Sequence, residues 1–162
     1  MSVFETMKQL RLLDWYTLLI GLERGWCKKE HLIDYCEEII NQQIDCDGID
    51  EGLITVIATK NPSNEDVVAT VLQLLKKQKK PPILEKKIEA IEKWRLAHLY
   101  WLLQQNLPEQ TKLNVLQELY AQFEFPDDMA ACSIYSRAEI DPLVAATNVM
   151  EKLSHQFCQQ NN

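Results

Sequence analysis

Apolar and polar positions follow the 3.6-residue period of amphipathic helices along most of the chain. Within residues 28–43, for example, Leu32, Cys36 and Ile39 recur at the spacing of one helix face. The same pattern predicts further helices before and after this segment. The expected helices cover residues 3–13, 15–24, 28–43, 48–60, 65–78, 83–105 and 107–124, and the last one begins at Asp141 and Pro142.

Residues suited to helix ends mark several of these boundaries. Asp14 and Ser63 are expected N-caps, because their side-chain oxygens can accept a hydrogen bond from the first turn. Gly25 suits the left-handed conformation that ends many helices, and Pro82 suits the first turn of a helix. The pattern and the caps therefore agree on where the chain changes direction.

About eight helices with short connections predict an all-α fold with little or no sheet. The alternatives are a single-domain bundle or stacked antiparallel helix pairs. A chain of 162 residues is expected to form one domain over residues 1–162. The Lys-Lys-Pro-Pro sequence of residues 79–82 is the candidate seam between subdomains.

The acidic segment 45–52 raises the question of a calcium site. An EF-hand loop that began at Asp45 would need an oxygen ligand at about position 5, glycine at 6 and glutamate at 12. The chain has Ile49, Asp50 and Val56 at these positions, so a turn between helices is the better interpretation. The cysteines and histidines also lack zinc-ligand spacing. We expect no metal and no cofactor.

The five cysteines, at irregular spacings, favour reduced thiols in a cytoplasmic protein. The N-terminal residues do not follow the pattern of a secretory signal peptide. No apolar run reaches the roughly 18 residues of a membrane helix. We therefore expect a cytoplasmic protein that does not associate with membranes.

Charge is distributed unevenly along this chain of formal net charge −7. Residues 30–59 contain eight acidic residues and no lysine or arginine, whereas residues 76–95 contain eight basic and three acidic residues. Separated charge steers charged partners, and an acidic segment repels phosphate. The lysine cluster of residues 76–80 lacks the aromatic residues that stack on bases. We expect a basic protein partner and no nucleic acid. The alternative is that the acidic face is solvated and has no partner.

The predicted partner-binding face combines acidic residues of this stretch with one aromatic residue as an apolar anchor. The aromatic residue directly follows the predicted helix stop at Gly25, where it can reach the surface. The face consists of Trp26, Asp34, Glu37, Glu38, Asp45, Asp47, Asp50 and Glu51.

The expected helix 83–105 carries two polar residues, Arg95 and His98, on an apolar stripe that should be buried. A buried arginine is costly unless it is paired. We therefore expect structural pairing that involves Arg95, His98 and the adjacent acids Asp127 and Asp128, or an acid from the first helices. The stripe consists of Leu84, Ile88, Ile91, Arg95, His98 and Leu102.

An acid–base site built on His98 is the less favoured alternative, because no nucleophile or second catalytic group accompanies this histidine. The chain also lacks a nucleophile elbow, a phosphate-binding glycine loop and a dinucleotide fingerprint. We expect that the protein is not an enzyme.

Three motifs follow one another along the chain, within residues 14–40, 93–103 and 116–136. With these motifs the chain resembles a family of small bacterial proteins classified only as a domain of unknown function. After Met129, residues 130–140 depart from the more aromatic segment of the family, which leaves their role open. The matching residues are Trp15, Leu18, Gly21, Leu22, Gly25, Trp26, Trp94, Arg95, Tyr120, Phe123, Phe125, Pro126, Asp128 and Met129.

Members of this family are similar to proteins that lie beside polymorphic toxin genes and are thought to act as immunity proteins. The resemblance implies a cytoplasmic protein that neutralises a cognate toxin domain by tight binding. An acidic face is compatible with a basic toxin, such as a nuclease whose active site attracts phosphate. A helical adaptor or a homodimeric module without a toxin partner is the alternative. The identity of a toxin and the oligomeric state stay open.

Overall fold

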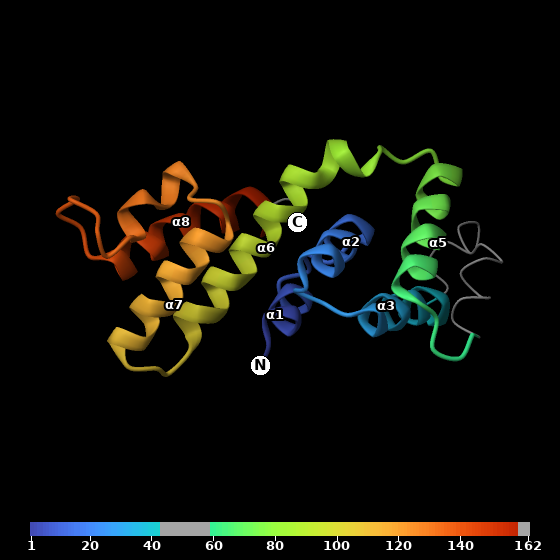
Figure 1. Ribbon diagram of the computed structural model, residues 1–162, viewed down its shortest axis with the longest axis horizontal. Helices are drawn as coiled ribbons and strands as arrows, with labels where there is room; N and C mark the ends of the chain where they lie inside the picture. The colour runs from blue at the N-terminus through green and yellow to red at the C-terminus, as the bar shows by residue number, and fades with distance from the viewer. Residues whose placement is uncertain (43–58, 159–162) are drawn as a thin grey trace. The chain divides into compact units, whose positions relative to one another are not determined.

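The computed structural model describes residues 1–42 and 59–158 (Figure 1). Within these ranges the chain forms seven α-helices and one 3-10 helix and contains no strand, which confirms the prediction of an all-α fold. The elements are α1 (Val3–Gln9), α2 (Trp15–Arg24), α3 (Lys29–Asn41), α5 (Asn64–Lys77), α6 (Ile83–Gln104), α7 (Glu109–Gln122), the 3-10 helix η2 (Asp127–Cys132) and α8 (Pro142–Cys158).

Two groups of predictions fall on residues 43–58, outside the described ranges. They are the helix expected at 48–60, of which only the last two residues are described, and the acidic face residues Asp45, Asp47, Asp50 and Glu51.

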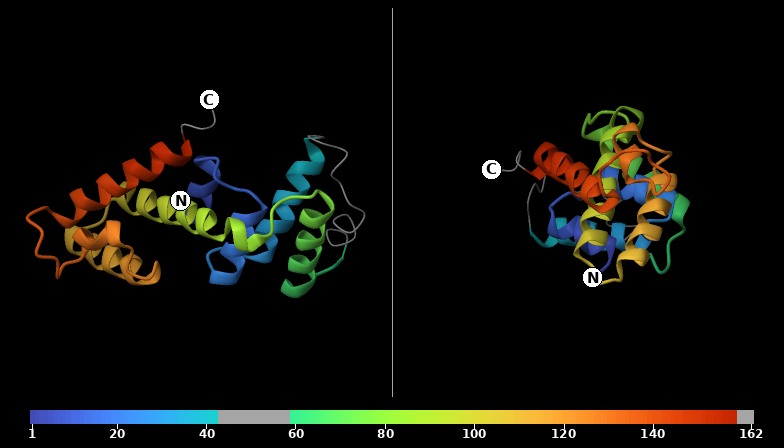
Figure 2. Two further views of the ribbon diagram at one scale, coloured as in Figure 1. Left: turned by 90° about the horizontal axis from the view of Figure 1, so that it is seen from above. Right: turned by 90° about the vertical axis from the view of Figure 1, so that its left-hand side faces the viewer.

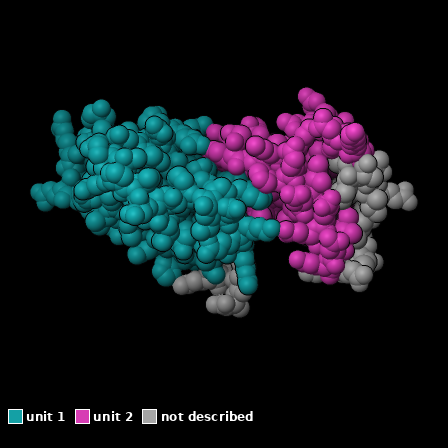
Figure 3. Space-filling model, turned by 90° about the horizontal axis from the view of Figure 1, so that it is seen from below, with its two compact units in different colours: residues 1–12, 91–162 teal, residues 13–90 magenta. Residues whose placement is uncertain are grey.

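The chain divides into two compact units, coloured separately in Figure 3. Unit 1 comprises Met1–Leu12 and Ile91–Asn162, and unit 2 comprises Leu13–Ala90. The second boundary falls inside α6, and residues 79–82 lie within unit 2. The prediction of a single domain over residues 1–162 stays a prediction.

In unit 1, α7 folds back along the C-terminal half of α6 (Figure 1). The His98 ring of α6 contacts Phe123 at the end of α7, and Lys112 near the start of α7 donates to the Leu103 carbonyl of α6. The helices η2 and α8 pack on each other and on α7 (Figure 2). The Trp101 indole nitrogen donates to the Met1 carbonyl at 2.7 Å and holds the N-terminal segment against α6.

Fully buried side chains from each of these elements form the core of unit 1. They bury apolar area at about 25 cal/mol per Å², which is the main stabilisation available to the unit. The largest of them are Met7, Trp94, Leu96, Leu99, Leu102, Leu116, Met129 and Leu153.

In unit 2, α3 packs against both α2 and α5. Cys36 of α3 and Leu74 of α5 form a buried cluster against which Trp15 and Ile40 pack. The Tyr16 hydroxyl of α2 donates to the Pro81 carbonyl at 2.7 Å and fixes the chain just before α6. Unit 2 is therefore held by short contacts among three helices and the segment that leads into a fourth.

Local capping accounts for several helix ends, and the caps predicted at Asp14, Ser63 and Gly25 are confirmed. The Asp14 carboxylate accepts from Thr17 N at 2.7 Å, and the Ser63 hydroxyl accepts from Asp66 N at 3.1 Å. Gly25 ends α2 with φ = 75°, a left-handed conformation that costs glycine little. At the start of α8 the Asp141 carboxylate accepts from Leu143 N at 2.9 Å. These ends are set by residues within the first or last turn.

Two details of the sequence prediction are wrong. Leu84 and Ile88, predicted to be buried, are 80% and 78% exposed, although Arg95, His98 and Leu102 on the same stripe are buried. Periodicity marks an apolar stripe, but burial also requires an element that faces the stripe. Residues 127–132, for which no helix was predicted, form the 3-10 helix η2.

Candidate functional site

The exposed face of α3 carries a strip of carboxylates, which we term the acidic strip. It consists of Glu30, Asp34 and Glu37, all exposed, with the half-buried Glu38 at its edge. At about 100° per residue, the three exposed acids lie within about 60° of arc. The opposite side of the helix holds the buried residues Leu32 and Cys36. The strip is thus continuous and directed away from the core of unit 2.

Basic side chains do not neutralise the strip from within α3. The single lysine of the helix is Lys29, whose ammonium group donates to Asn61 Oδ1 and to the Pro62 carbonyl, both at 2.8 Å. His31 lies in the first turn, and its Nδ1 accepts a hydrogen bond from Lys28 N at 2.9 Å. These residues serve the start of the helix and its attachment to the segment before α5.

The placement of the acids works against helix stability. Glu30 and Asp34, and likewise Asp34 and Glu38, are like charges four residues apart, and each such pair costs about 0.2–0.5 kcal/mol. Glu38 lies in the last turn, where the helix dipole disfavours negative charge and where no basic residue is present. Only Glu30, in the first turn, is favourably placed. Helix formation alone therefore does not explain this arrangement of charge.

Of the residues predicted for the partner-binding face, Asp34, Glu37 and Glu38 lie together on α3. Trp26 lies in the connection between α2 and α3, half-buried, with the Arg24 guanidinium 6.0 Å from the centre of its ring. Sequence reasoning did not select Glu30, although its spacing of four residues from Asp34 and seven from Glu37 places it on the same face.

Arg95 lies at the centre of a charged cluster in unit 1. Its side chain is 4% exposed, and its Nη1 donates to Asp128 Oδ1 at 2.6 Å. Its Nη2 donates to the Glu92 carboxylate one turn earlier on α6. The second oxygen of Asp128 accepts from Lys152 of α8 at 2.5 Å. Asp128 thus connects α6 to α8, whereas Asp127 takes no part in these bonds.

The ionisation of this cluster is fixed by its hydrogen bonds. Burial alone would raise the pKa of Asp128, but the bonds from Arg95 and Lys152 lower it below its ordinary value. Burial opposes the charge of Arg95, yet the bonds to Asp128 and Glu92 raise the pKa of its guanidinium. Arg95 and Asp128 are both charged at neutral pH, and together they form a structural connection.

His98 lies one turn after Trp94 and is 8% exposed. Its Nδ1 lies 2.8 Å from the Trp94 carbonyl oxygen and therefore carries the proton of the neutral ring. Its ring meets Phe123 edge-on at 5.4 Å between centroids. Burial lowers the pKa of His98, while the bond to the Trp94 carbonyl opposes the shift. The histidine is packed as a neutral core residue.

The third sequence motif forms the structure that brings Asp128 to Arg95. Tyr120 and Phe125 contact each other edge-on at 5.1 Å, where the chain leaves α7 through a left-handed residue at Phe125. The Pro126 carbonyl then accepts from Met129 N at 3.0 Å, within η2. Met129 is fully buried. The motif thus has a structural role in the fold of unit 1.

Two other kinds of site are absent from residues 1–42 and 59–158. No group of three or more His, Cys, Asp or Glu side chains in these residues could hold a metal ion. Among the same residues, no helix combines the length and the apolar character that crossing a membrane requires.

Fold and surface together define the class: an all-α protein that displays a strip of carboxylates on one helix. The chain belongs to the bacterial family described as "Uncharacterized protein conserved in bacteria (DUF2247)", whose family model matches residues 4–161. This match confirms the predicted relation to a bacterial domain of unknown function. Neither a curated protein nor a solved structure matches the chain significantly.

Proposed function

We propose that this protein is a non-enzymatic, cytoplasmic immunity protein that neutralises a basic toxin domain by binding it through the acidic strip of α3. The acidic strip is the observation that carries the proposal. Its acids lie on one face, and Glu30, Asp34 and Glu37 are exposed. Repulsion between like charges and the negative charge near the end of the helix oppose the stability of α3. Charge that costs folding free energy is expected where it serves binding.

The proposal draws its toxin partner from the resemblance to proteins of polymorphic toxin loci. A nuclease toxin needs basic residues around its active site to attract phosphate. A rigid row of carboxylates complements such a surface, accelerates encounter and competes with nucleic acid for the same cations. This explains why an acidic helix would suit the inhibitor without requiring any catalytic group on it.

The contacts of Arg95 and His98 support a binding protein over an enzyme. The Arg95 guanidinium is engaged by Asp128 and Glu92, and the His98 ring is held by Trp94 and Phe123. A general base must reach a substrate proton, whereas these groups are buried in contacts that support the fold.

The test is coexpression with the candidate toxin encoded by the adjacent gene. The C-terminal domain of that gene product would be produced with and without this protein, and growth and co-elution would be measured. The proposal expects toxicity, rescue by this protein and a 1:1 complex. Toxicity without rescue and without a complex would contradict it and would favour the adaptor alternative.

The role of the acidic strip is tested in the same assay. The double variant Asp34→Lys, Glu37→Lys should weaken the complex by about tenfold or more, because close interfacial charges contribute strongly to association. The matched control is Glu118→Lys, Glu151→Lys, which reverses two exposed acids of unit 1. Equal affinity of the two double variants would overturn the assignment of the strip while leaving rescue intact as evidence for immunity.

A further inference from the structure

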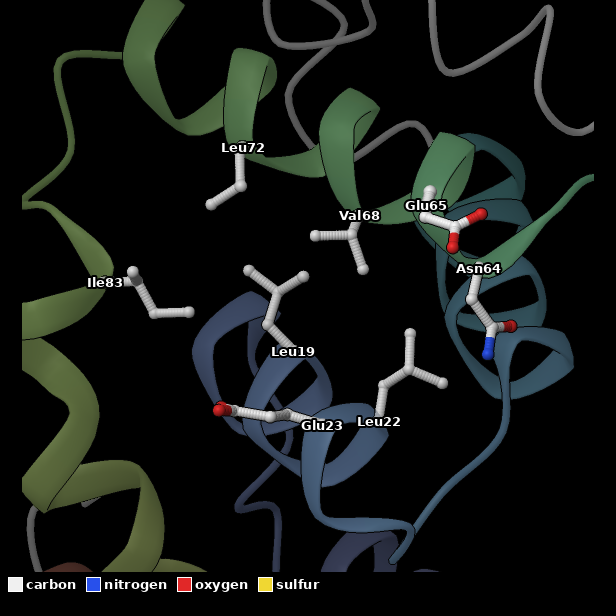
Figure 4. Close-up of a pocket in the computed structure, with 8 residues that line it drawn as sticks. All are labelled: Leu19, Leu22, Glu23, Asn64, Glu65, Val68, Leu72 and Ile83. Atoms are coloured by element: carbon white, nitrogen blue, oxygen red, sulfur yellow. The ribbon is translucent and has the colours of Figure 1, made fainter.

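Unit 2 contains an apolar groove between α2 and α5, closed at one end by the first residue of α6 (Figure 4). We term it the α2–α5 groove. Its volume is about 380 Å³. Leu19 points up from α2, Val68 and Leu72 point down from α5, and Ile83 points in from α6. The lining residues are Leu19, Leu22, Glu23, Asn64, Glu65, Val68, Leu72 and Ile83.

The groove is partly open to solvent. Leu72 is 40% exposed, and Leu22, Val68 and Ile83 are only half-buried. Pockets for small molecules enclose most of their ligand, typically about 70–90% of its surface. An open apolar groove between two helices instead resembles the surfaces that receive side chains from a partner helix. Burying these side chains under a partner would gain about 25 cal/mol per Å² of apolar area.

Acidic groups stand at the rim of this apolar surface. Glu23 from α2 and Glu65 from α5 lie apart from each other on either side of it (Figure 4). Among residues 1–42 and 59–158, neither carboxylate has an ion pair or a hydrogen bond to a side chain. The described lining includes no lysine or arginine. The groove therefore offers aliphatic contact in the middle and uncompensated negative charge at the rim.

From this combination we propose that the α2–α5 groove is a docking site for a basic amphipathic segment of a protein partner. One or two aliphatic side chains of the segment enter between Leu19, Val68 and Leu72. Lysine or arginine side chains beside them pair with Glu23 and Glu65. Arginine suits this position best, because its planar fork can pair with a carboxylate while its stem covers apolar surface.

This docking site is separate from the acidic strip, since the groove is lined by α2, α5 and α6, whereas the strip belongs to α3. The proposal does not depend on a toxin. Its test uses displayed random peptides, so a negative result would leave the immunity proposal unaffected, and a failed coexpression assay would leave the groove proposal unaffected.

The probe is a phage-displayed library of random peptides of about 16 residues, long enough for four helical turns. The library would be selected on the full-length protein, and affinity for the leading peptide would be measured by fluorescence anisotropy. We expect enriched sequences that share aliphatic residues flanked by lysine or arginine. No enrichment, or enriched peptides without basic residues, would overturn the proposal.

Variants distinguish peptide binding at the groove from binding at acidic residues elsewhere on the surface. Glu23→Gln combined with Glu65→Gln should lower the affinity of the protein for the leading peptide about tenfold and reduce the salt dependence of binding. Leu72→Asp, at an exposed position that the core does not need, should abolish binding without lowering the melting temperature. The matched control is Asp66→Asn, which neutralises the exposed acid next to Glu65 outside the groove and should keep affinity within about twofold.

Two further results would contradict the proposal. If Asp66→Asn weakened peptide binding as much as the Glu23→Gln, Glu65→Gln variant did, the loss of affinity would reflect the overall charge of the protein and not the groove. A free protein that is dimeric at micromolar concentration, and that Leu72→Asp converts to a monomer, would assign the groove to a second copy of this chain.

Discussion

The Arg95 guanidinium and the Asp128 carboxylate, 33 residues apart in the sequence, meet at 2.6 Å in unit 1. Because Asp128 also accepts from Lys152, this one carboxylate joins α6, η2 and α8. Arg95 is almost fully buried, while the Asp128 side chain is 27% exposed. Loss of the carboxylate would leave the guanidinium with Glu92 as its acidic partner. Two predictions about unit 1 rest on this region.

Asp128→Asn should destabilise the protein by about 1.5–3 kcal/mol, the range for hydrogen bonds to charged groups. Asp127→Asn is the matched control, since the neighbouring acid takes no part in the bonds to Arg95 and Lys152, and it should change the unfolding free energy by less than about 0.5 kcal/mol. Urea unfolding followed by circular dichroism would measure both. In an Arg95→Met background, Asp128→Asn should lower the unfolding free energy clearly less than it does in the parent protein. An equal cost in both backgrounds would show that the pair is not coupled.

His98 should make stability depend on pH on the acidic side of neutrality. Burial lowers its pKa in the folded state, so between that pKa and the ordinary value of 6.5 the unfolded chain binds a proton that the folded chain does not. The unfolding free energy therefore falls as pH drops below about 6.5 and levels off below the folded pKa. Asp128 contributes to the pH dependence of stability in a separate pH range, below its ordinary pKa of 3.8, because its pKa is also lowered in the folded state.

The measurement is urea unfolding at pH values between about 4.5 and 7.5. His98→Asn keeps an N–H that can reach the Trp94 carbonyl but removes the titration, so the slope in this range should flatten. A parent protein whose stability does not change between pH 5 and 6.5 would contradict the neutral, buried state of His98.

What could be predicted from the sequence was mainly local. Asp14, Ser63 and Gly25 act within one turn of their own helix, so their spacing was enough to place helix ends. Arg95 was predicted to be buried and to need an acid, but the sequence could not choose between Asp127 and Asp128. That choice depends on the 3-10 turn after Pro126, which determines which carboxylate faces α6.

Features that depend on tertiary packing could not be predicted. Leu84 and Ile88 continue an apolar stripe, yet they are exposed, because periodicity does not say whether an element faces the stripe. The α2–α5 groove combines residues from positions 19 to 83, and in the sequence Val68 and Leu72 look like ordinary core positions of an amphipathic helix. Only the packing of α3 against both α2 and α5 leaves them at the surface of a hollow.

The acidic strip should oppose the stability of unit 2. Asp34→Asn combined with Glu37→Gln removes like-charge repulsion and negative charge toward the C-terminal end of α3, and should raise the unfolding free energy by about 0.3–1 kcal/mol. Glu65→Gln should instead lower the unfolding free energy, because Glu65 lies in the first turn of α5, where the helix dipole favours negative charge. Thermal unfolding at low ionic strength would compare them. A destabilised Asp34, Glu37 variant would mean that the strip has a structural role.

The thiols of the described residues should differ widely in reactivity. Burial raises the pKa of Cys27 to about 12 and that of Cys36 to about 11; it also raises the pKa of Cys132 to about 11, with a further increase from Asp128. At pH 8 about one in a thousand of these groups, or fewer, is a thiolate, the form that attacks disulfide reagents. Cys158 is less buried than the other three.

Ellman's reagent at pH 8 would test this in a Cys46→Ser background, which confines the signal to the four described thiols. One thiol should react in a fast phase, and the other three should react roughly a hundredfold more slowly, at a rate that rises with urea as the cores open. Cys158→Ser should remove the fast phase. A fast phase that survives this substitution would mean that Cys27, Cys36 or Cys132 is exposed in the native protein, and it would contradict the packing of the unit that contains it.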